Sequence, residues 1–348
     1  VKVLEAIAEA HGGFSFDFTE YPWSCDYYLQ HGSMMPPDGL DQLDQHEAIY
    51  MGACGFPSKV PDHISLWGLI LPIRKKFDLY INLRPVKLLR GVRGPLRDKG
   101  PEDIDFVCVR ENTEGEYSGV GGRVHVGTPH EVAIQSNIFT RHGVERVMRY
   151  SFELAQKRPR KKLLSVTKSN ACQYSMVFWD EVFDELKTEY PDVNGTQGHV
   201  DAVSALFVKA PEVLDVVVAS NLFADILTDL GGALQGSLGL SPSANIDPLR
   251  RHPSLFEAVH GSAPDIAGKG IANPIATIWA GAMMLEFLGH PDAEALLMRA
   301  IEAVTEEGKT VTPDLGGKAT TAQVGDAIVA QVRALARSGA PTATAGRG

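Results

Sequence analysis

The chain has 348 residues, of which 44% are hydrophobic and 22% are charged, and its formal net charge is −10. This composition is ordinary for a globular protein, and the length favours two domains over one. The negative charge and the absence of an apolar run of about 18 residues lead us to expect neither nucleic acid nor a membrane among its partners.

The first third of the chain alternates short apolar runs with helical patterns. We expect helices at 1–10, at 20–45 (ended by a proline-rich turn) and at 66–79, and strands at 14–19, 47–55, 79–85 (stopped by Pro85) and 105–110.

The rest of the chain continues this alternation. We expect a hairpin-like excursion at 117–137, helices at 139–155, 171–189, 199–210, 274–288, 293–308 and 321–336, strands at 162–167, 214–219 and 256–260, and a disordered tail at 337–348. Strands that alternate with helices predict an α/β protein with a largely parallel sheet.

Four cysteines are scattered along the chain without C-x-x-C spacing: Cys25, Cys54, Cys108 and Cys172. This pattern argues against a disulfide framework and against a zinc site. It fits a reducing compartment, so we expect a cytoplasmic protein.

Two acidic residues follow the buried strand at 214–219. Ser220 or Asn221 is suited to cap a helix that carries Asp225 and Asp229, four residues apart on one face. Because like charges repel, the pair suggests a divalent metal between the carboxylates. The alternative is two acids placed to favour the helix dipole.

Three arginines are candidates for binding an anion. Arg74 lies in a helical pattern, and Arg84 and Arg110 stand where two strands end. A guanidinium group matches a carboxylate with two parallel hydrogen bonds. The alternative for each is an ordinary surface arginine.

Three further residues have side chains suited to proton transfer or metal binding. Tyr117 follows the arginine of Val109-Arg-Glu-Asn-Thr-Glu-Gly-Glu-Tyr-Ser118, and Lys168 ends a strand. Asp201 lies at the start of an expected helix. The alternative is an acid that only favours the dipole of this helix from its first turn. The alternatives are a packed tyrosine and a solvated lysine.

A glycine-rich loop follows the last expected strand and ends at Pro274, where a helix begins. Such a loop lets backbone approach a ligand closely, and Asp265 is suited to bind a ribose diol. The alternative is a simple connection, although loops this long are uncommon without a role. Neither G-x-G-x-x-G nor G-x-x-x-x-G-K-[ST] is present.

Four motifs together resemble the β-decarboxylating dehydrogenases, the family of isocitrate, 3-isopropylmalate, tartrate and D-malate dehydrogenases. The motifs are Asn82-Leu-Arg-Pro85, the segment from Val109 to Ser118, Asn221-Leu-Phe-Ala-Asp-Ile-Leu-Thr-Asp229 and His260-Gly-Ser-Ala-Pro-Asp-Ile-Ala-Gly268. The family opens with a strand and a Gly-Asp-Gly-Ile-Gly-like turn that this sequence lacks. We expect that the protein has this segment and that the given sequence begins after it.

The resemblance implies two domains that share a continuous, largely parallel sheet with a non-Rossmann dinucleotide site. Residues 1–79 and 236–348 would form the cofactor-side domain, and residues 80–235 the substrate and dimerisation domain. The excursion near 117–137 resembles the family's dimer arm. By the same likeness, the unit of catalysis is a homodimer with shared active sites.

The resemblance also implies a role for each site residue. The arginines would bind the departing carboxylate. Asp225 and Asp229 would bind Mg²⁺ or Mn²⁺ together with the partner's Asp201. Tyr117 and the partner's Lys168 would transfer protons. NAD would lie against a loop that includes Asp265, which disfavours NADP, and K⁺ is a candidate additional cation. The loop residues implied to bind NAD are His260, Gly261, Ser262, Ala263, Asp265 and Asn273.

The substrate implied by the resemblance is a small 2-hydroxy dicarboxylic acid. Ile70 and Trp67 occupy the segment that contacts the C3 group in the family and leave no serine for an additional carboxylate. The motifs look most like those of tartrate and D-malate dehydrogenases, so we predict NAD-dependent oxidation of tartrate, and of D-malate, with or without decarboxylation. The alternatives are a 3-isopropylmalate dehydrogenase and a noncatalytic regulatory subunit.

Overall fold

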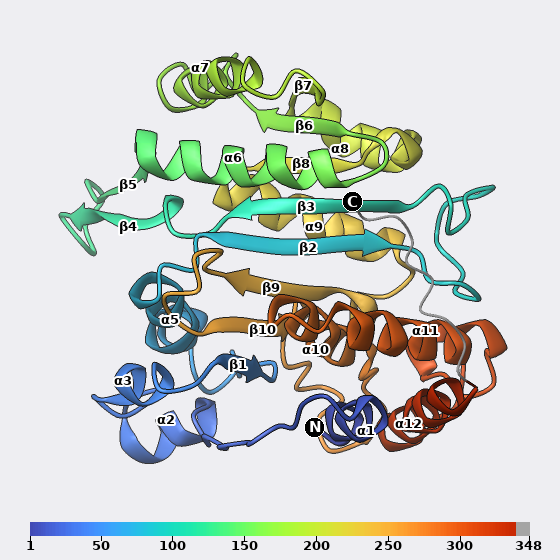
Figure 1. Cartoon of the computed structure of the whole chain (residues 1–348). Helices are drawn as coiled ribbons and strands as arrows, with labels where there is room; N and C mark the ends of the chain where they lie inside the picture. The colour runs from blue at the N-terminus through green and yellow to red at the C-terminus, as the bar shows by residue number, and fades with distance from the viewer. Residues whose placement is uncertain (339–348) are drawn as a thin grey trace. The chain divides into compact units, whose positions relative to one another are not determined.

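The computed structural model describes residues 1–338, and Figure 1 shows their arrangement within two compact units. The first unit contains residues 1–79, 85–104 and the described residues from 232 onward. The second unit contains residues 80–84 and 105–231. From residue 339 on, the expected tail lies outside the described residues.

The first unit contains a four-stranded part of the sheet in the order β1-β10-β9-β2. β1 pairs with β10 in parallel, and β10 pairs with β9 in the antiparallel direction. The strands are β1 (Ala48–Met51), β10 (Ser254–Ala258), β9 (Pro242–Ile246) and β2 (Ile81–Lys87), the last of which continues from the second unit.

Helices surround these strands. They are α1 (Lys2–His11), α2 (Cys25–His31), α3 (Gly39–Leu43), α4 (Asp62–Ser65), the π-helix η1 (Leu66–Ile70), α5 (Leu71–Lys76), α10 (Ile275–Phe287), α11 (Pro291–Glu307) and α12 (Thr321–Arg337), with short 3₁₀ turns η3 (Leu238–Leu240) and η4 (Pro313–Leu315). α10 is apolar on all sides because β10 lies against it on one side and α1 and α11 on others.

The second unit continues the sheet in the order β2-β3-β8-β6-β7, and the pairs β3·β8, β8·β6 and β6·β7 are parallel. Helix α6 lies on one face of these strands and α9 on the other (Figure 1). The strands are β3 (Asp105–Glu111), β8 (Val216–Ala219), β6 (Lys162–Thr167) and β7 (Asn194–His199). The helices are α6 (Arg141–Lys157), α7 (Ser175–Lys187), α8 (Val200–Lys209), the 3₁₀ turn η2 (Pro211–Val213) and α9 (Asn221–Leu234).

A separate hairpin of β4 (Gly115–Val124) and β5 (Val132–Ile138) projects from the second unit, where the sequence predicts an excursion (Figure 1). The predicted fold class, an α/β protein with a largely parallel sheet, is confirmed. No helix among residues 1–338 has the length and apolarity to cross a bilayer.

Several expected elements differ from the structure. The predicted strand at 14–19 is wrong, because this segment pairs with no strand. The Phe14 ring meets that of Phe16 edge-on, and Phe16 stacks on Phe18. The expected helix at 20–45 is two short helices, since Gly32 ends α2 with φ 74°. β2 also continues two residues past Pro85.

Strands β7 and β9 were missed because they lack an apolar alternation. β7 reads Asn-Gly-Thr-Gln-Gly-His and β9 reads Pro-Ser-Ala-Asn-Ile. Their neighbours in the sheet, rather than their own composition, keep them extended.

Phe207 on α8 offers a test of the core of the second unit. Its side chain is fully buried and meets the Phe106 ring of β3 edge-on at 4.9 Å. We expect Phe207→Ala to lower the free energy of unfolding by about 3–5 kcal/mol through the cavity it leaves. Urea unfolding followed by circular dichroism measures the change. The exposed neighbour Lys209→Ala serves as control, and equal stability of both variants would contradict this packing.

Candidate active site

The register of the parallel strands brings the first site residues together. Arg110 at the end of β3 pairs with Ala219 at the end of β8, and α9 begins two residues later. The carboxyl ends of parallel strands form the edge at which α/β proteins bind their ligands. Arg110 and the acidic residues of α9 therefore lie at the same edge.

Asp225 is the centre of this cluster. Its Oδ1 accepts hydrogen bonds from Nη1 of Arg84, at 3.2 Å, and from Nη1 of Arg110. Its Oδ2 accepts from the hydroxyl of Tyr117 at 3.0 Å. The Arg110 guanidinium also lies 5.3 Å from the centroid of the Tyr117 ring, within cation–π range. Four residues that the sequence analysis singled out are thus in direct contact.

Both guanidinium groups are buried, and neutral side chains fix each of them. Arg84 donates from Nε to Oδ1 of Asn82 at 2.8 Å and from Nη1 to Oγ1 of Thr228 at 2.6 Å. Arg110 donates to the side-chain oxygen of Asn221. Buried charges are costly unless they are paired, so two cations here favour an anion at this point.

Asp229 lies one helical turn beyond Asp225. Burial raises the pKa of the Asp229 carboxyl, and the negative charge of Asp225 raises it further, while Arg84 and Arg110 act in the opposite direction. A divalent cation would relieve both unfavourable effects, and carboxylate oxygens are the ligands that Mg²⁺ prefers. The two side chains therefore fit a metal chemically.

Asp225 and Asp229 are two of the three ligands that the sequence analysis predicts. No group of three His, Cys, Asp or Glu side chains within the described part of the chain is placed to hold an ion. Asp201, the predicted third ligand, instead accepts a hydrogen bond from Nζ of Lys168 at 2.8 Å. That its metal ligation occurs in a neighbouring subunit remains a prediction.

The pairing of β6 with β7 explains why Lys168 meets Asp201. Thr167 pairs with His199, so the residues just after the two strands are neighbours. The hydrogen bond from Lys168 is the main cause that lowers the pKa of the Asp201 carboxyl. The structure therefore describes a lysine–aspartate ion pair, largely open to solvent on the aspartate side.

Arg74 and Ile70 belong to the first unit. Arg74 is buried and donates from Nη2 to Oε1 of Glu257 at 3.2 Å, an oxygen that Asn245 also binds at 2.9 Å. Ile70 is partly buried at the end of the π-helix. In the same π-helix, Trp67 is 45% exposed with Nζ of Lys75 4.8 Å from its ring centroid.

The loop from His260 to Asn273 also belongs to the first unit. Nε2 of His260 is buried without a hydrogen-bond partner, and Nδ1 lies 2.9 Å from the Gly261 carbonyl oxygen. Ala263 has φ 45°, and Asp265, like Gly261, is exposed. Ser262 is held by a hydrogen bond to the Gly55 carbonyl.

Asn273 ends this loop and holds the start of α10. Its Oδ1 accepts from the backbone N–H of Ile275 at 3.0 Å, and its Nδ2 donates to Asp314 at 3.0 Å. The loop is thus anchored at both ends, and its exposed middle is free of secondary structure.

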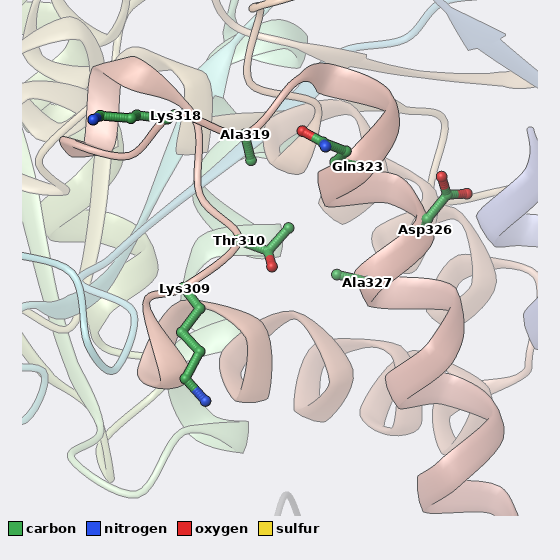
Figure 2. A pocket seen from close by; sticks show the side chains of 7 residues that line it. All are labelled: Lys309, Thr310, Lys318, Ala319, Gln323, Asp326 and Ala327. Carbon is green, nitrogen blue, oxygen red and sulfur yellow. The ribbon is translucent and has the colours of Figure 1, made fainter.

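Two surface hollows of the first unit contain none of the predicted site residues. The larger, of about 460 Å³, lies between the turn before α12 and the exposed side of that helix (Figure 2), and it is lined by Lys309, Thr310, Lys318, Ala319, Gln323, Asp326 and Ala327. The smaller, of about 310 Å³, is lined by Ala6, Glu9, Ala10, Arg333, Ala336 and Arg337. Neither contains a predicted site residue, whereas the Asp225 cluster contains four in direct contact, so this cluster is the candidate site.

The sequence analysis missed the neutral residues that hold the arginines. Asn82 lies two residues before Arg84, on the same face of β2, and Thr228 lies three residues after Asp225, on the same face of α9. The spacing of two residues in a strand and of three in a helix could have indicated these contacts from the sequence. Asn221 was considered only as a helix cap, whereas its carboxamide binds Arg110.

This combination of buried arginines, a tyrosine and paired acids at the carboxyl edge of a parallel sheet defines an α/β enzyme that acts on a small anion. Comparison with known proteins makes the class specific. Residues 1–328 match the isocitrate/isopropylmalate dehydrogenase family. The chain belongs to this family, which confirms the resemblance inferred from the motifs.

Relatives with closely similar sequences are dehydrogenases of small hydroxy acids. The chain is 58% identical to the D-malate dehydrogenase [decarboxylating] of Escherichia coli (strain K12), over 94% of this chain and 92% of the relative. It is 55% identical to the tartrate dehydrogenase/decarboxylase of Pseudomonas putida, over 94% and 91%. Among solved structures, isocitrate dehydrogenase from Methylococcus capsulatus matches with a TM-score of 0.84, 37% identity and 95% coverage of both chains.

The raised pKa of Asp229 predicts a pH-dependent stability. Above its folded-state pKa the carboxyl is charged and costs stability, whereas below its ordinary value of 3.8 it is neutral in both states. We expect Asp229→Asn, without divalent metal, to raise the thermal midpoint at pH 7, with a gain that vanishes as the pH falls below about 4. Differential scanning calorimetry measures it.

The exposed residue Asp184 on α7 provides the control, since Asp184→Asn removes a charge without relieving burial. A destabilised Asp229→Asn at pH 7, or a gain that persists at low pH, would contradict the burial of a disfavoured charge at this position.

Proposed function

We propose that the protein catalyses the NAD-dependent and metal-dependent oxidation of a small 2-hydroxy dicarboxylic acid, with tartrate and D-malate as substrates. The observation that carries the proposal is the contact of Arg84, Arg110 and Tyr117 with Asp225. The names of relatives that are 54–58% identical over most of the chain support the choice of substrates.

The two buried arginines supply the carboxylate site. In the structure Asp225 occupies the donors of Arg84 and Arg110 with one carboxylate oxygen. A substrate carboxylate has the same charge and shape and takes over these donors, which releases Asp225 to bind a cation. Arg74 is proposed as the third guanidinium that binds the carboxylate destined to leave as carbon dioxide.

Mg²⁺ or Mn²⁺, when bound, polarises the oxygen at C2 and stabilises negative charge that develops there. Asp225 and Asp229 would hold the ion together with Asp201 of the partner subunit. Lys168 of the partner subunit, in its neutral amine form, would accept the hydroxyl proton as hydride leaves for NAD. The hydrogen bond between Lys168 and Asp201 keeps the two side chains beside each other.

Tyr117 is the proposed acid at the end of the reaction. Its hydroxyl donates to Asp225 in the structure, so the phenolic proton already points into the cluster. After loss of carbon dioxide, an enol carbon must gain a proton, and we propose Tyr117 as the group that donates it.

The exposed loop of the first unit is the proposed NAD site. Backbone at Gly261, Ser262 and Ala263 is open to a ligand, and the charge of Asp265 would repel a 2′-phosphate while accepting hydrogen bonds from a ribose diol. His260 and Asn273 stand at the two ends of this loop, and both are proposed to contact NAD. K⁺ remains a candidate additional cation by family resemblance alone.

A homodimer is the proposed assembly. The β4–β5 hairpin exposes apolar side chains that a single chain leaves in water: Val120, Val124, Val132, Ile134 and Ile138. A contiguous exposed apolar surface of this kind is typical of a protein–protein contact. Such an assembly would supply Lys168 and Asp201 to the neighbouring site.

The alternatives remain a 3-isopropylmalate dehydrogenase and a noncatalytic subunit. Trp67 and Ile70 in the π-helix favour a small C3 substituent over an isopropyl group. A regulatory subunit would not need the complete set of arginine, tyrosine, lysine and aspartate side chains that this sequence carries.

Initial-rate assays test the substrate and the metal together. We expect the purified chain with NAD and Mn²⁺ to form NADH from D-malate and tartrate at least tenfold faster than from 3-isopropylmalate. A single methylene in a pocket changes rates by about 10- to 200-fold, and the isopropyl group is larger than that. Excess EDTA should abolish the activity, and Mn²⁺ should restore it. Full activity in EDTA would refute the metal role, and turnover of 3-isopropylmalate alone would establish the first alternative.

Tyr117→Phe tests the final proton transfer. We expect formation of the decarboxylated product from D-malate to fall by about 100-fold or more, because general acids contribute factors of this size, with a much smaller change in KM. Single-turnover product analysis measures it. Tyr174→Phe, at a residue 83% exposed, is the matched control. An unchanged rate in Tyr117→Phe would exclude this tyrosine as the acid.

A further inference from the structure

Asn221, the first residue of α9, is bonded through both ends of its carboxamide. Its Oδ1 accepts from Nε of Arg110 at 3.0 Å and from Nη2 of Arg110 at 2.8 Å. Its Nδ2 donates to the backbone carbonyl of Glu114 at 3.2 Å. Since the guanidinium only donates and a carbonyl only accepts, the orientation of the amide is determined. Asn221 is 1% exposed, so water does not compete for these bonds.

We propose that Asn221 is a positioning residue that fixes the Arg110 guanidinium for the second carboxylate of the substrate without adding a negative charge of its own. Two bonds to the Nε–Nη2 edge fix the plane of the guanidinium, and the Nη1 side then faces Asp225. A neutral amide holds the arginine without cancelling its charge, which a carboxylate at the same place would do. The inference rests on the proposed function.

The turn behind Asn221 is itself fixed. Glu111 is buried, and its Oε1 accepts from the backbone N–H of Thr113 at 2.7 Å and of Glu114 at 3.0 Å. The Glu114 carboxylate in turn binds the backbone N–H and the hydroxyl of Thr140 at the start of α6. The carbonyl that receives Nδ2 of Asn221 therefore belongs to a turn anchored on both sides.

Helix capping does not account for Asn221, because other residues cap α9. The Ser220 hydroxyl accepts from the backbone N–H of Phe223 at 3.4 Å, and Oε2 of Glu116 accepts from that of Leu222 at 3.2 Å. A carboxylate at a helix N-terminus also favours the helix dipole. The oxygen of Asn221 is directed to Arg110 instead.

Kinetics with two ligands separate positioning from a purely structural role. D-malate carries the second carboxylate, whereas 2-hydroxybutyrate replaces it with a methyl group and serves as a competitive inhibitor. We expect Asn221→Ala to raise KM for D-malate by about 10- to 100-fold, the size of a lost charged hydrogen bond, with a smaller change in kcat. The Ki of 2-hydroxybutyrate should stay within about twofold of wild type, because that ligand makes no use of Arg110.

Asn221→Asp is the second variant, since it keeps the shape and the bonds to Arg110 but adds a charge. Because this substitution also removes the donor to the Glu114 carbonyl, the Ki of 2-hydroxybutyrate is measured in this variant too. We expect KM for D-malate to rise at least as much as in Asn221→Ala while that Ki stays within about twofold of wild type, whereas loss of the turn contact alone would weaken both ligands equally. Asn194→Ala, at an exposed residue of β7, is the control with wild-type constants. Equal loss for both ligands, or normal KM in Asn221→Asp, would overturn the positioning role. A wild-type protein inactive on every dicarboxylate would instead overturn the proposed function, and with it this inference.

Discussion

The ion pairs of Arg84 and Arg110 with Asp225 are the interaction on which the candidate site depends. Two buried guanidinium groups would be very unfavourable without a negative charge beside them, and Asp225 provides that charge in the folded chain. A substrate carboxylate can provide the same charge. The arrangement therefore stabilises the folded chain, and under the proposed function the same contacts select for an anion of carboxylate shape.

The fold supplies this arrangement through strand register. The pairing of Arg110 with Ala219 places the end of β3 beside the start of α9, and the pairing of Thr167 with His199 places Lys168 beside Asp201. Parallel strands make both juxtapositions possible because all their carboxyl ends lie at one edge. Lys168 follows β6 and Asp201 lies in the first turn of α8, whereas Arg84 and Arg110 lie within strands and Asp225 and Asp229 lie within α9.

Much of this organisation was predictable from the sequence. Apolar periodicity indicated the alternating strands and helices, and polar residues at strand ends indicated Arg110 and Lys168. The same argument selected Arg84, although β2 continues to Lys87 and Arg84 lies within the strand. The partners of these residues were not predictable, since Asn221 is 111 residues from Arg110 in the chain and meets it only through sheet pairing. Strands β7 and β9 were missed because neighbouring strands, rather than their own composition, keep them extended. The aromatic residues at 14–18 have the alternating pattern of a strand, but their rings contact one another instead.

A crystal structure with Mn²⁺ and D-malate tests the central claim most directly. The account predicts an anomalous manganese peak beside Asp225 and Asp229, a ligand carboxylate on the guanidinium groups of Arg84 and Arg110, and loss of the direct bonds from these arginines to Asp225. An Asp225 that keeps both arginine bonds, with the ligand or the manganese bound elsewhere, would contradict it.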